Sequence, residues 1–63
     1  MDRKTLIARL RQLQANDINA LAVYTELSEL VKDNGQRNVF SDIAYDEKRH
    51  IALIKEMLLL LEK

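Results

Sequence analysis

Two helix-length stretches of this chain each carry a regular stripe of apolar side chains. The positions alternate by three and four residues, a spacing that keeps side chains on one face of a helix. The first stripe contains Leu6, Leu10, Leu13, Asp17, Ala20, Tyr24, Leu27 and Val31. The second stripe contains Phe40, Ile43, Glu47, His50, Ile54, Met57 and Leu61. The pattern therefore predicts two amphipathic helices whose apolar faces pack against each other.

One short segment, Asp33-Asn34-Gly35, separates the two stripes. Asn-Gly favours the positive φ angles that end a helix and turn the chain, and Asp2 is placed to cap the first helix. We predict one domain over residues 1–63, with a helix at about residues 3–33, a turn at 34–36 and a second helix at about 37–62. A turn this short makes the two helices antiparallel.

Both helices carry more apolar side chains than a single partner helix covers. Leu53, Leu58 and Leu60 lie beside the second stripe, and Leu21 and Val23 lie beside the first. A chain of 63 residues also has difficulty building a sufficient core on its own. The predicted fold class is therefore all-α: an antiparallel helical hairpin that dimerises into a four-helix bundle.

The composition excludes several classes of protein. Ten Lys and Arg side chains balance ten Asp and Glu side chains, so the net charge gives no attraction to nucleic acid or to an anionic membrane. The chain has no Cys, which excludes disulfides and thiolate metal sites. The longest apolar run, Met57 to Leu61, is too short to cross a bilayer, and the basic, amphipathic N-terminus is unlike a signal peptide. We expect a cytoplasmic protein.

Three ionisable residues, Asp17, Glu47 and His50, interrupt the stripes. Side chains in these positions face the partner helix, where desolvation is costly without compensation. Glu47 and His50 are three residues apart and share a helix face. A reversal of the chain at Gly35 would place residue 50 opposite residue 20 and residue 47 opposite Tyr24, with Asp17 about one turn from His50. Carboxylate and imidazole ligands without thiolate suit iron or manganese.

Dimerisation would double this set of ligands. Two hairpins supply four carboxylates and two imidazoles, and four negative charges balance two divalent cations. The alternative is a metal-free hairpin that serves as a dimerisation or scaffold module. In that case a Glu47–His50 or Asp17–His50 hydrogen bond would fix the register of a buried polar layer. Asp17 by itself is either a ligand or a polar side chain partnered by Asn16 or a water molecule.

Two segments carry a resemblance to a known family. They read Asp17-Ile18-Asn19-Ala20-Leu21-Ala22-Val23-Tyr24 and Ile43-Ala44-Tyr45-Asp46-Glu47-Lys48-Arg49-His50. An acidic residue followed by Ala-x-x-x-Tyr, and then Glu-x-x-His on the next helix, resembles the pattern of ferritin-like di-iron proteins. The likeness is closest to the rubrerythrin group and to half-length encapsulated ferritins, and it covers roughly residues 10–60.

The resemblance implies a function. Glu47 and His50 would be metal ligands with Asp17 beside them, and the Tyr24 hydroxyl would donate a hydrogen bond to a ligand carboxylate. The implied cofactor is two iron ions per dimer, with manganese as the other candidate metal. The implied chemistry is oxidation of Fe(II) by dioxygen or peroxide, of the ferroxidase or peroxidase type. The expected assembly is a homodimer or higher homo-oligomer, and iron storage would require a larger shell or a host protein compartment.

The chain departs from the family pattern at two points. The family has Glu where this chain has Asp17, whose side chain is one methylene shorter. The shorter side chain turns a bridging ligand into a terminal one, weakens one iron, or leaves Asp17 away from the metal. The absence of Cys also means that no rubredoxin-type iron site accompanies the helices.

Overall fold

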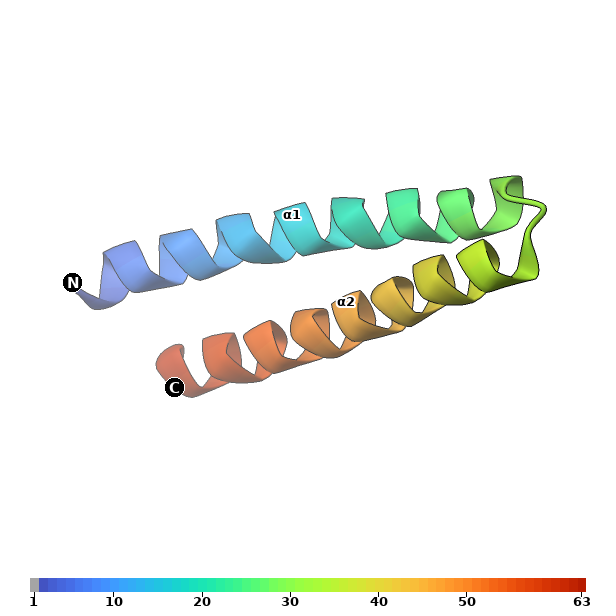
Figure 1. Ribbon diagram of the computed structural model, residues 1–63. Helices are drawn as coiled ribbons and strands as arrows, with labels where there is room; N and C mark the ends of the chain where they lie inside the picture. Colours follow the sequence, from blue (N-terminus) through green and yellow to red (C-terminus); the bar gives the residue numbers. More distant parts are fainter. Residues whose placement is uncertain (1) are drawn as a thin grey trace.

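The computed structural model describes residues 2–63, which form two antiparallel helices of equal length. Helix α1 spans Arg3–Leu30 and helix α2 spans Asn34–Leu61, each with 28 residues. The helices lie side by side as a rod of 46 × 14 × 14 Å (Figure 1). At the open end of the hairpin, Arg11 pairs with Glu62, and the Arg3 guanidinium donates a hydrogen bond of 3.3 Å to the Lys63 carbonyl. The predicted all-helical hairpin is confirmed.

An aspartate caps the start of each helix. The Asp2 carboxylate accepts a 2.7 Å hydrogen bond from the Thr5 backbone N–H, as predicted. Asp33 plays the same role for α2, where its carboxylate accepts a 2.8 Å bond from the Gln36 N–H. These bonds satisfy backbone donors that have no partner within the helix.

The connection between the helices comes earlier than the sequence predicts. It consists of residues 31–33, whereas we expected a turn at residues 34–36. Gly35 lies inside the first turn of α2, and no glycine among residues 2–63 has a positive φ. The physical reason is the Asp33 cap, which starts α2 before Asn34-Gly35 can act as a turn. On the other side of the connection, the Arg37 side chain donates a hydrogen bond of 3.1 Å to the Val31 carbonyl.

This earlier connection changes which residues face each other. Lys32 is its central residue, so residues equally far from Lys32 lie level on the two helices. Tyr24 and Phe40, each eight residues away, stack with ring centroids 6.5 Å apart. Tyr24 therefore lies opposite Phe40, and our expectation that it faces residue 47 was wrong.

The side of α2 that faces α1 also differs from the predicted stripe. The buried side chains are Ala44, Ile54 and Leu58, and all three belong to α2. His50 and Met57, which we placed in the stripe, are exposed. The apolar surface of α2 is wide enough to offer two such stripes, and the observed one sets Leu58 rather than Met57 against α1.

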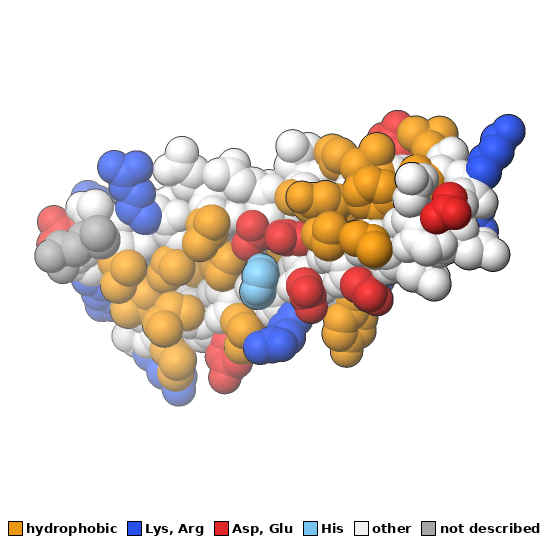
Figure 2. Space-filling view, in the orientation of Figure 1, with side chains coloured by type: hydrophobic (Ala, Val, Ile, Leu, Met, Phe, Trp, Pro, Cys, Tyr) orange, Lys and Arg blue, Asp and Glu red, His pale blue; other side chains and the backbone are white. Residues whose placement is uncertain are grey.

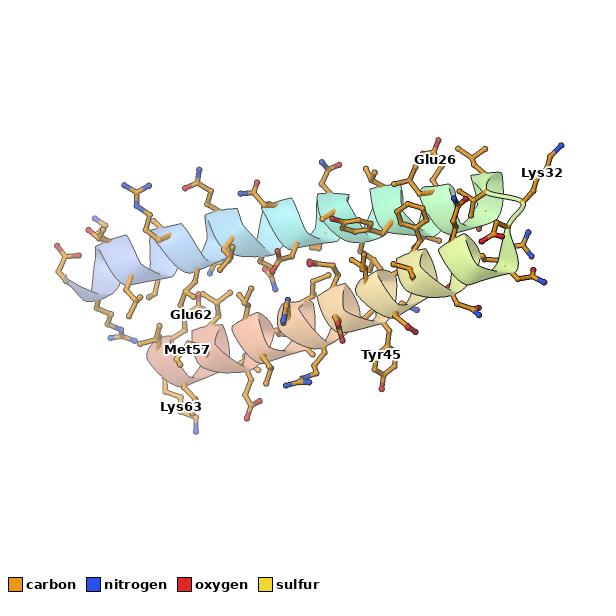
Figure 3. All side chains as sticks on the ribbon, in the orientation of Figure 1. Glu26, Lys32, Tyr45, Met57, Glu62 and Lys63 are labelled. Carbon is orange, nitrogen blue, oxygen red and sulfur yellow. The ribbon has the colours of Figure 1, made fainter. Side chains whose placement is uncertain are left out.

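A single hairpin leaves many of its large apolar side chains in contact with solvent. Among residues 2–63, ten large apolar side chains are exposed over 46–70% of their surface. Some of them project from the sides of the rod, as Figure 3 shows for Tyr45. Figure 2 shows two apolar areas on one face of the rod, separated by acidic side chains and the imidazole. Neither α1 nor α2 contains a stretch long and apolar enough to cross a membrane.

Removal of the Asp33 cap should weaken the hairpin. We expect Asp33→Ala to lower the free energy of unfolding by about 1 kcal/mol, because the Gln36 N–H loses its acceptor. Asp33→Asn keeps an acceptor oxygen and should cost less. Urea unfolding followed by circular dichroism measures both, and equal losses in the two variants would contradict this role of the cap.

The Asp2 cap should depend on pH. The hydrogen bond from the Thr5 backbone N–H lowers the pKa of Asp2 below its usual value of 3.8. A lowered pKa means that the cap stabilises the fold fully above the unfolded value and is lost as the pH falls through the folded one. An NMR titration of the Asp2 carboxyl should give a midpoint below 3.8, and a midpoint above that value would contradict the cap.

Candidate metal centre

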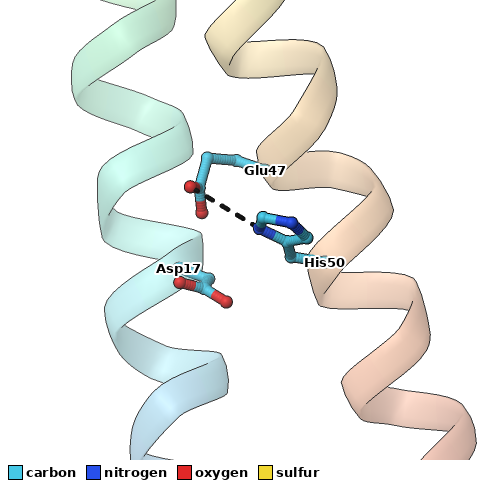
Figure 4. A group of neighbouring side chains, drawn as sticks. All are labelled: Asp17, Glu47 and His50. Atoms are coloured by element: carbon cyan, nitrogen blue, oxygen red, sulfur yellow. Dashed lines mark ion pairs between the residues drawn. The ribbon is translucent and has the colours of Figure 1, made fainter.

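The three ionisable residues of the apolar stripes meet at the middle of the hairpin. Asp17 and Glu47 are each fifteen residues from Lys32, so the register that stacks Tyr24 on Phe40 also sets Asp17 level with Glu47. His50 lies one turn further along α2, on the same side of the helix as Glu47. Figure 4 shows Asp17 reaching from α1 toward the two side chains of α2.

The side chains come within reach of a single ion. One potential ligand atom from each of Asp17, Glu47 and His50 lies within 4.8 Å of the other two. The His50 Nδ1 atom is 3.9 Å from the Glu47 Oε1 atom, too far for a hydrogen bond. Two ligands on opposite sides of an ion bound at about 2.1 Å are about 4.2 Å apart. Small side-chain rotations would therefore bring all three atoms onto one cation.

Burial differs across the cluster. The Glu47 side chain is only 17% exposed, and Asp17 is half-buried. The His50 side chain is 55% exposed and lies at the edge of the contact between the helices. A single hairpin therefore supplies a cluster that is closed by protein on the Glu47 side and open to solvent on the His50 side.

Glu47 provides the clearest sign that the cluster fits a cation. Its Oε2 atom is buried and has no hydrogen-bond partner among residues 2–63. A buried carboxylate oxygen without a donor is strongly disfavoured, and the facing carboxylate of Asp17 adds a like charge. A divalent cation would satisfy the orphaned oxygen and neutralise both carboxylates.

The structure brings together three of the four residues singled out from the sequence. Asp17, Glu47 and His50 form the cluster, and no other group of three or more potential ligands occurs within the described part of the chain. Tyr24 lies one heptad toward the connection, stacked on Phe40, and its hydroxyl donates no hydrogen bond to the orphaned Glu47 oxygen. The buried Ile54 lies one heptad from Glu47 on the other side. Apolar side chains thus flank the cluster along the rod.

Comparisons with models of known protein families, with curated proteins and with solved structures found no match for this chain. The geometry of the cluster and the chemistry of its side chains are therefore what identify it as a candidate site.

A test without metal follows from the orphaned carboxylate. In the presence of a chelator, Glu47→Leu should raise the free energy of unfolding by about 1–3 kcal/mol, because an apolar side chain replaces a buried charge without a partner. Glu56→Leu is the matched control at an exposed position of α2 and should change stability little. Chemical unfolding of both variants gives the comparison. A loss of stability in Glu47→Leu alone would contradict the assignment of a strained carboxylate.

Proposed function

We propose that two copies of this hairpin form a ferritin-like four-helix bundle with a di-iron centre between them, where Fe(II) is oxidised by dioxygen or peroxide. The observation that carries the proposal is the cluster of Asp17, Glu47 and His50 with its orphaned, buried carboxylate oxygen. The resemblance of the same segments to ferritin-like di-iron proteins supports the choice of iron, with manganese as the other candidate. The centre would hold one ion per hairpin.

The burial of the hairpin supports a second copy. Three buried side chains are too few to stabilise two helices of 28 residues in isolation. The face that carries His50 also carries the two exposed apolar areas of Figure 2. Pairing two such faces would bury both areas together with the open side of the cluster. Three side chains do not complete the coordination of a metal ion. The partner would then supply the remaining ligands.

The ligand set matches a divalent ion in charge and in chemical type. Asp17 and Glu47 contribute two negative charges per hairpin, which balance one divalent cation. His50 contributes a neutral nitrogen and must be deprotonated to bind metal. Mixed oxygen and nitrogen ligation without thiolate favours iron or manganese over softer metals.

The residues of the cluster and those that flank it have different roles in the proposed reaction. Two Fe(II) ions supply one electron each, enough to reduce one peroxide to two waters with two protons, or one dioxygen to one peroxide. Asp17 and Glu47 bind the iron substrate and compensate the charge that it gains on oxidation. The Tyr24–Phe40 stack and Ile54 exclude water from the cluster along the rod.

The alternative function, a metal-free dimerisation or scaffold module, depends on a hydrogen-bonded polar layer. None of the side-chain hydrogen bonds described for residues 2–63 joins Asp17, Glu47 and His50. The layer therefore lacks the bond that would fix its register, which favours the metal centre.

Anaerobic addition of Fe(II) to the purified protein tests the proposal. We expect about one bound iron per chain and a rise in melting temperature, because a metal that binds only the folded state stabilises it. His50→Ala and Asp17→Ala should abolish both effects. Lys48→Ala, an exposed position next to Glu47, is the matched control and should retain them. Absence of bound iron in the unmodified protein would overturn the centre.

The oxidation itself needs a separate measurement. After admission of air or peroxide, the unmodified protein should oxidise Fe(II) faster than buffer, with oxygen or peroxide consumed in proportion to the iron. The Glu47→Leu variant should show only the rate of buffer. Iron binding without accelerated oxidation would leave a binding protein and overturn the ferroxidase proposal.

A further inference from the structure

The pair Asn34-Gly35 begins helix α2 and takes no part in the candidate metal centre. Both residues are exposed to solvent. In an Asn-Gly pair, the backbone nitrogen of the glycine is close enough to the asparagine carboxamide carbon to form a cyclic imide with it. Glycine has no Cβ to hinder the approach of these two atoms. Asparagine is among the thermolabile residues of proteins, and this pair is therefore a candidate site of chemical modification.

The Gly35 nitrogen is not engaged in a hydrogen bond. Its N–H group has no acceptor among residues 2–63, as expected in the first turn of a helix. The next two backbone N–H groups differ. Gln36 donates a 2.8 Å hydrogen bond to the Asp33 carboxylate, and Arg37 donates a 2.9 Å bond to the Asp33 carbonyl. The attacking nitrogen is thus available, whereas the residues that follow it are held by the cap.

The two bonds to Asp33 hold Asn34 in a helical conformation. Attack on the carboxamide requires a rotation about the Asn34 Cα–C bond, away from its helical ψ angle. This rotation moves Gln36 and Arg37 away from Asp33, so both hydrogen bonds break. The reaction therefore proceeds only while the first turn of α2 is open, a local event that is most frequent at helix ends.

A second copy of the hairpin would leave this pair accessible. Asn34 and His50 are sixteen residues apart on α2. At about 100° per residue, Asn34 lies about 160° around the helix from His50. A partner that covers the His50 face would therefore leave Asn34 in contact with water.

We infer that Asn34-Gly35 is a site of spontaneous deamidation whose rate the Asp33 cap controls. The Gly35 nitrogen forms a bond to the Asn34 Cγ atom, the Cγ–Nδ2 bond breaks, and ammonia leaves with the proton of the Gly35 N–H. Water then opens the cyclic imide. Hydrolysis of the new bond gives an aspartyl residue at position 34. Hydrolysis of the original peptide bond gives an isoaspartyl residue, whose backbone continues through the side chain.

The two products have opposite effects on α2. An aspartyl residue adds a negative charge at the start of the helix, where it is favourable. An isoaspartyl residue adds one carbon to the backbone between Asp33 and Gln36, which displaces the Gln36 N–H from the Asp33 carboxylate. Because the cap fixes the start of α2, the isoaspartyl form loses the register that sets Asp17 level with Glu47. Its effect on iron binding rests on the proposed function.

Incubation of the unmodified protein at neutral pH with a chelator tests the site. Trypsin cuts after Lys32 and Arg37, so residues 33–37 form one peptide. We expect mass spectrometry to show this peptide exchanging NH2 for OH with time, in two forms that chromatography separates. An unchanged peptide, or equal conversion at the internal controls, would overturn the site. The controls are the exposed helical asparagines that precede a residue with a side chain: Asn16, Asn19 and Asn38.

Substitution of the caps tests the control of the rate. Asp33→Ala should speed the conversion about fivefold, which is the change in population that corresponds to the loss of one cap. Asp2→Ala removes the equivalent cap of α1 and is the matched control, so it should leave the rate at Asn34 unchanged. Equal rates in Asp33→Ala and the unmodified protein, or equal acceleration by Asp2→Ala, would overturn control by the Asp33 cap.

Substitution of the glycine tests the reacting nitrogen. In the unmodified chain, a Cβ at position 35 would lie 3.1 Å from the Asp33 Oδ2 atom. Asp33→Ala removes this contact, so Gly35→Ala is best compared in that background. The added methyl group should slow the conversion at Asn34 severalfold, because it hinders the approach of the nitrogen. An unchanged rate would overturn the attack by the Gly35 nitrogen.

The separated products test the effect on the fold, first without metal. The isoaspartyl form should melt at a lower temperature than the unmodified protein, and Asn34→Asp at the same or a higher one. An isoaspartyl form as stable as the unmodified protein would overturn the loss of register.

Iron binding by the same samples distinguishes this inference from the proposed function. Conversion at Asn34 in a protein that binds no iron would overturn the metal centre and leave the modification site intact. Equal iron binding by the isoaspartyl form and the unmodified protein would overturn the effect of the modification on the centre. We expect the isoaspartyl form to lose the iron that the unmodified protein binds.

Discussion

The three-residue connection between the helices sets the register of the hairpin, that is, which residues of α1 lie level with which residues of α2. With the reversal centred on Lys32, Tyr24 meets Phe40 and, one heptad further, Asp17 meets Glu47. One residue more or less in the connection would rotate α2 by about 100° relative to α1 and separate the two carboxylates. The Asp33 cap fixes the start of α2, so a local hydrogen bond also sets the position of Glu47, fourteen residues further along the chain.

Two features indicate that the isolated hairpin is an incomplete fold. Many of its large apolar side chains are exposed, and its cluster is open at His50. Both features disfavour the isolated chain, and one partner would compensate both of them. Burial of apolar surface and completion of a metal site would thus act at the same interface.

The sequence predicts the helices and the members of the cluster well, because apolar spacing and ionisable interruptions are local signals. It misplaces the connection, because Asn34-Gly35 is typical of a turn. In the structure Asp33 caps α2 instead, and Asn34 and Gly35 belong to the helix. The rotation of α2 is also missed. Stripes through Met57 and through Leu58 are both apolar, so only packing against α1 could choose between them. The exposure of His50 follows from that choice.

We propose that Asp17, Glu47 and His50 of two chains hold two metal ions. A crystal structure of the Fe(II)-loaded protein, with anomalous scattering recorded at the iron edge, would locate these ions. We expect two iron peaks about 3.5–4 Å apart, related by a two-fold axis, each in contact with these side chains. Iron bound elsewhere, or a dimer whose clusters lie apart and empty, would contradict it.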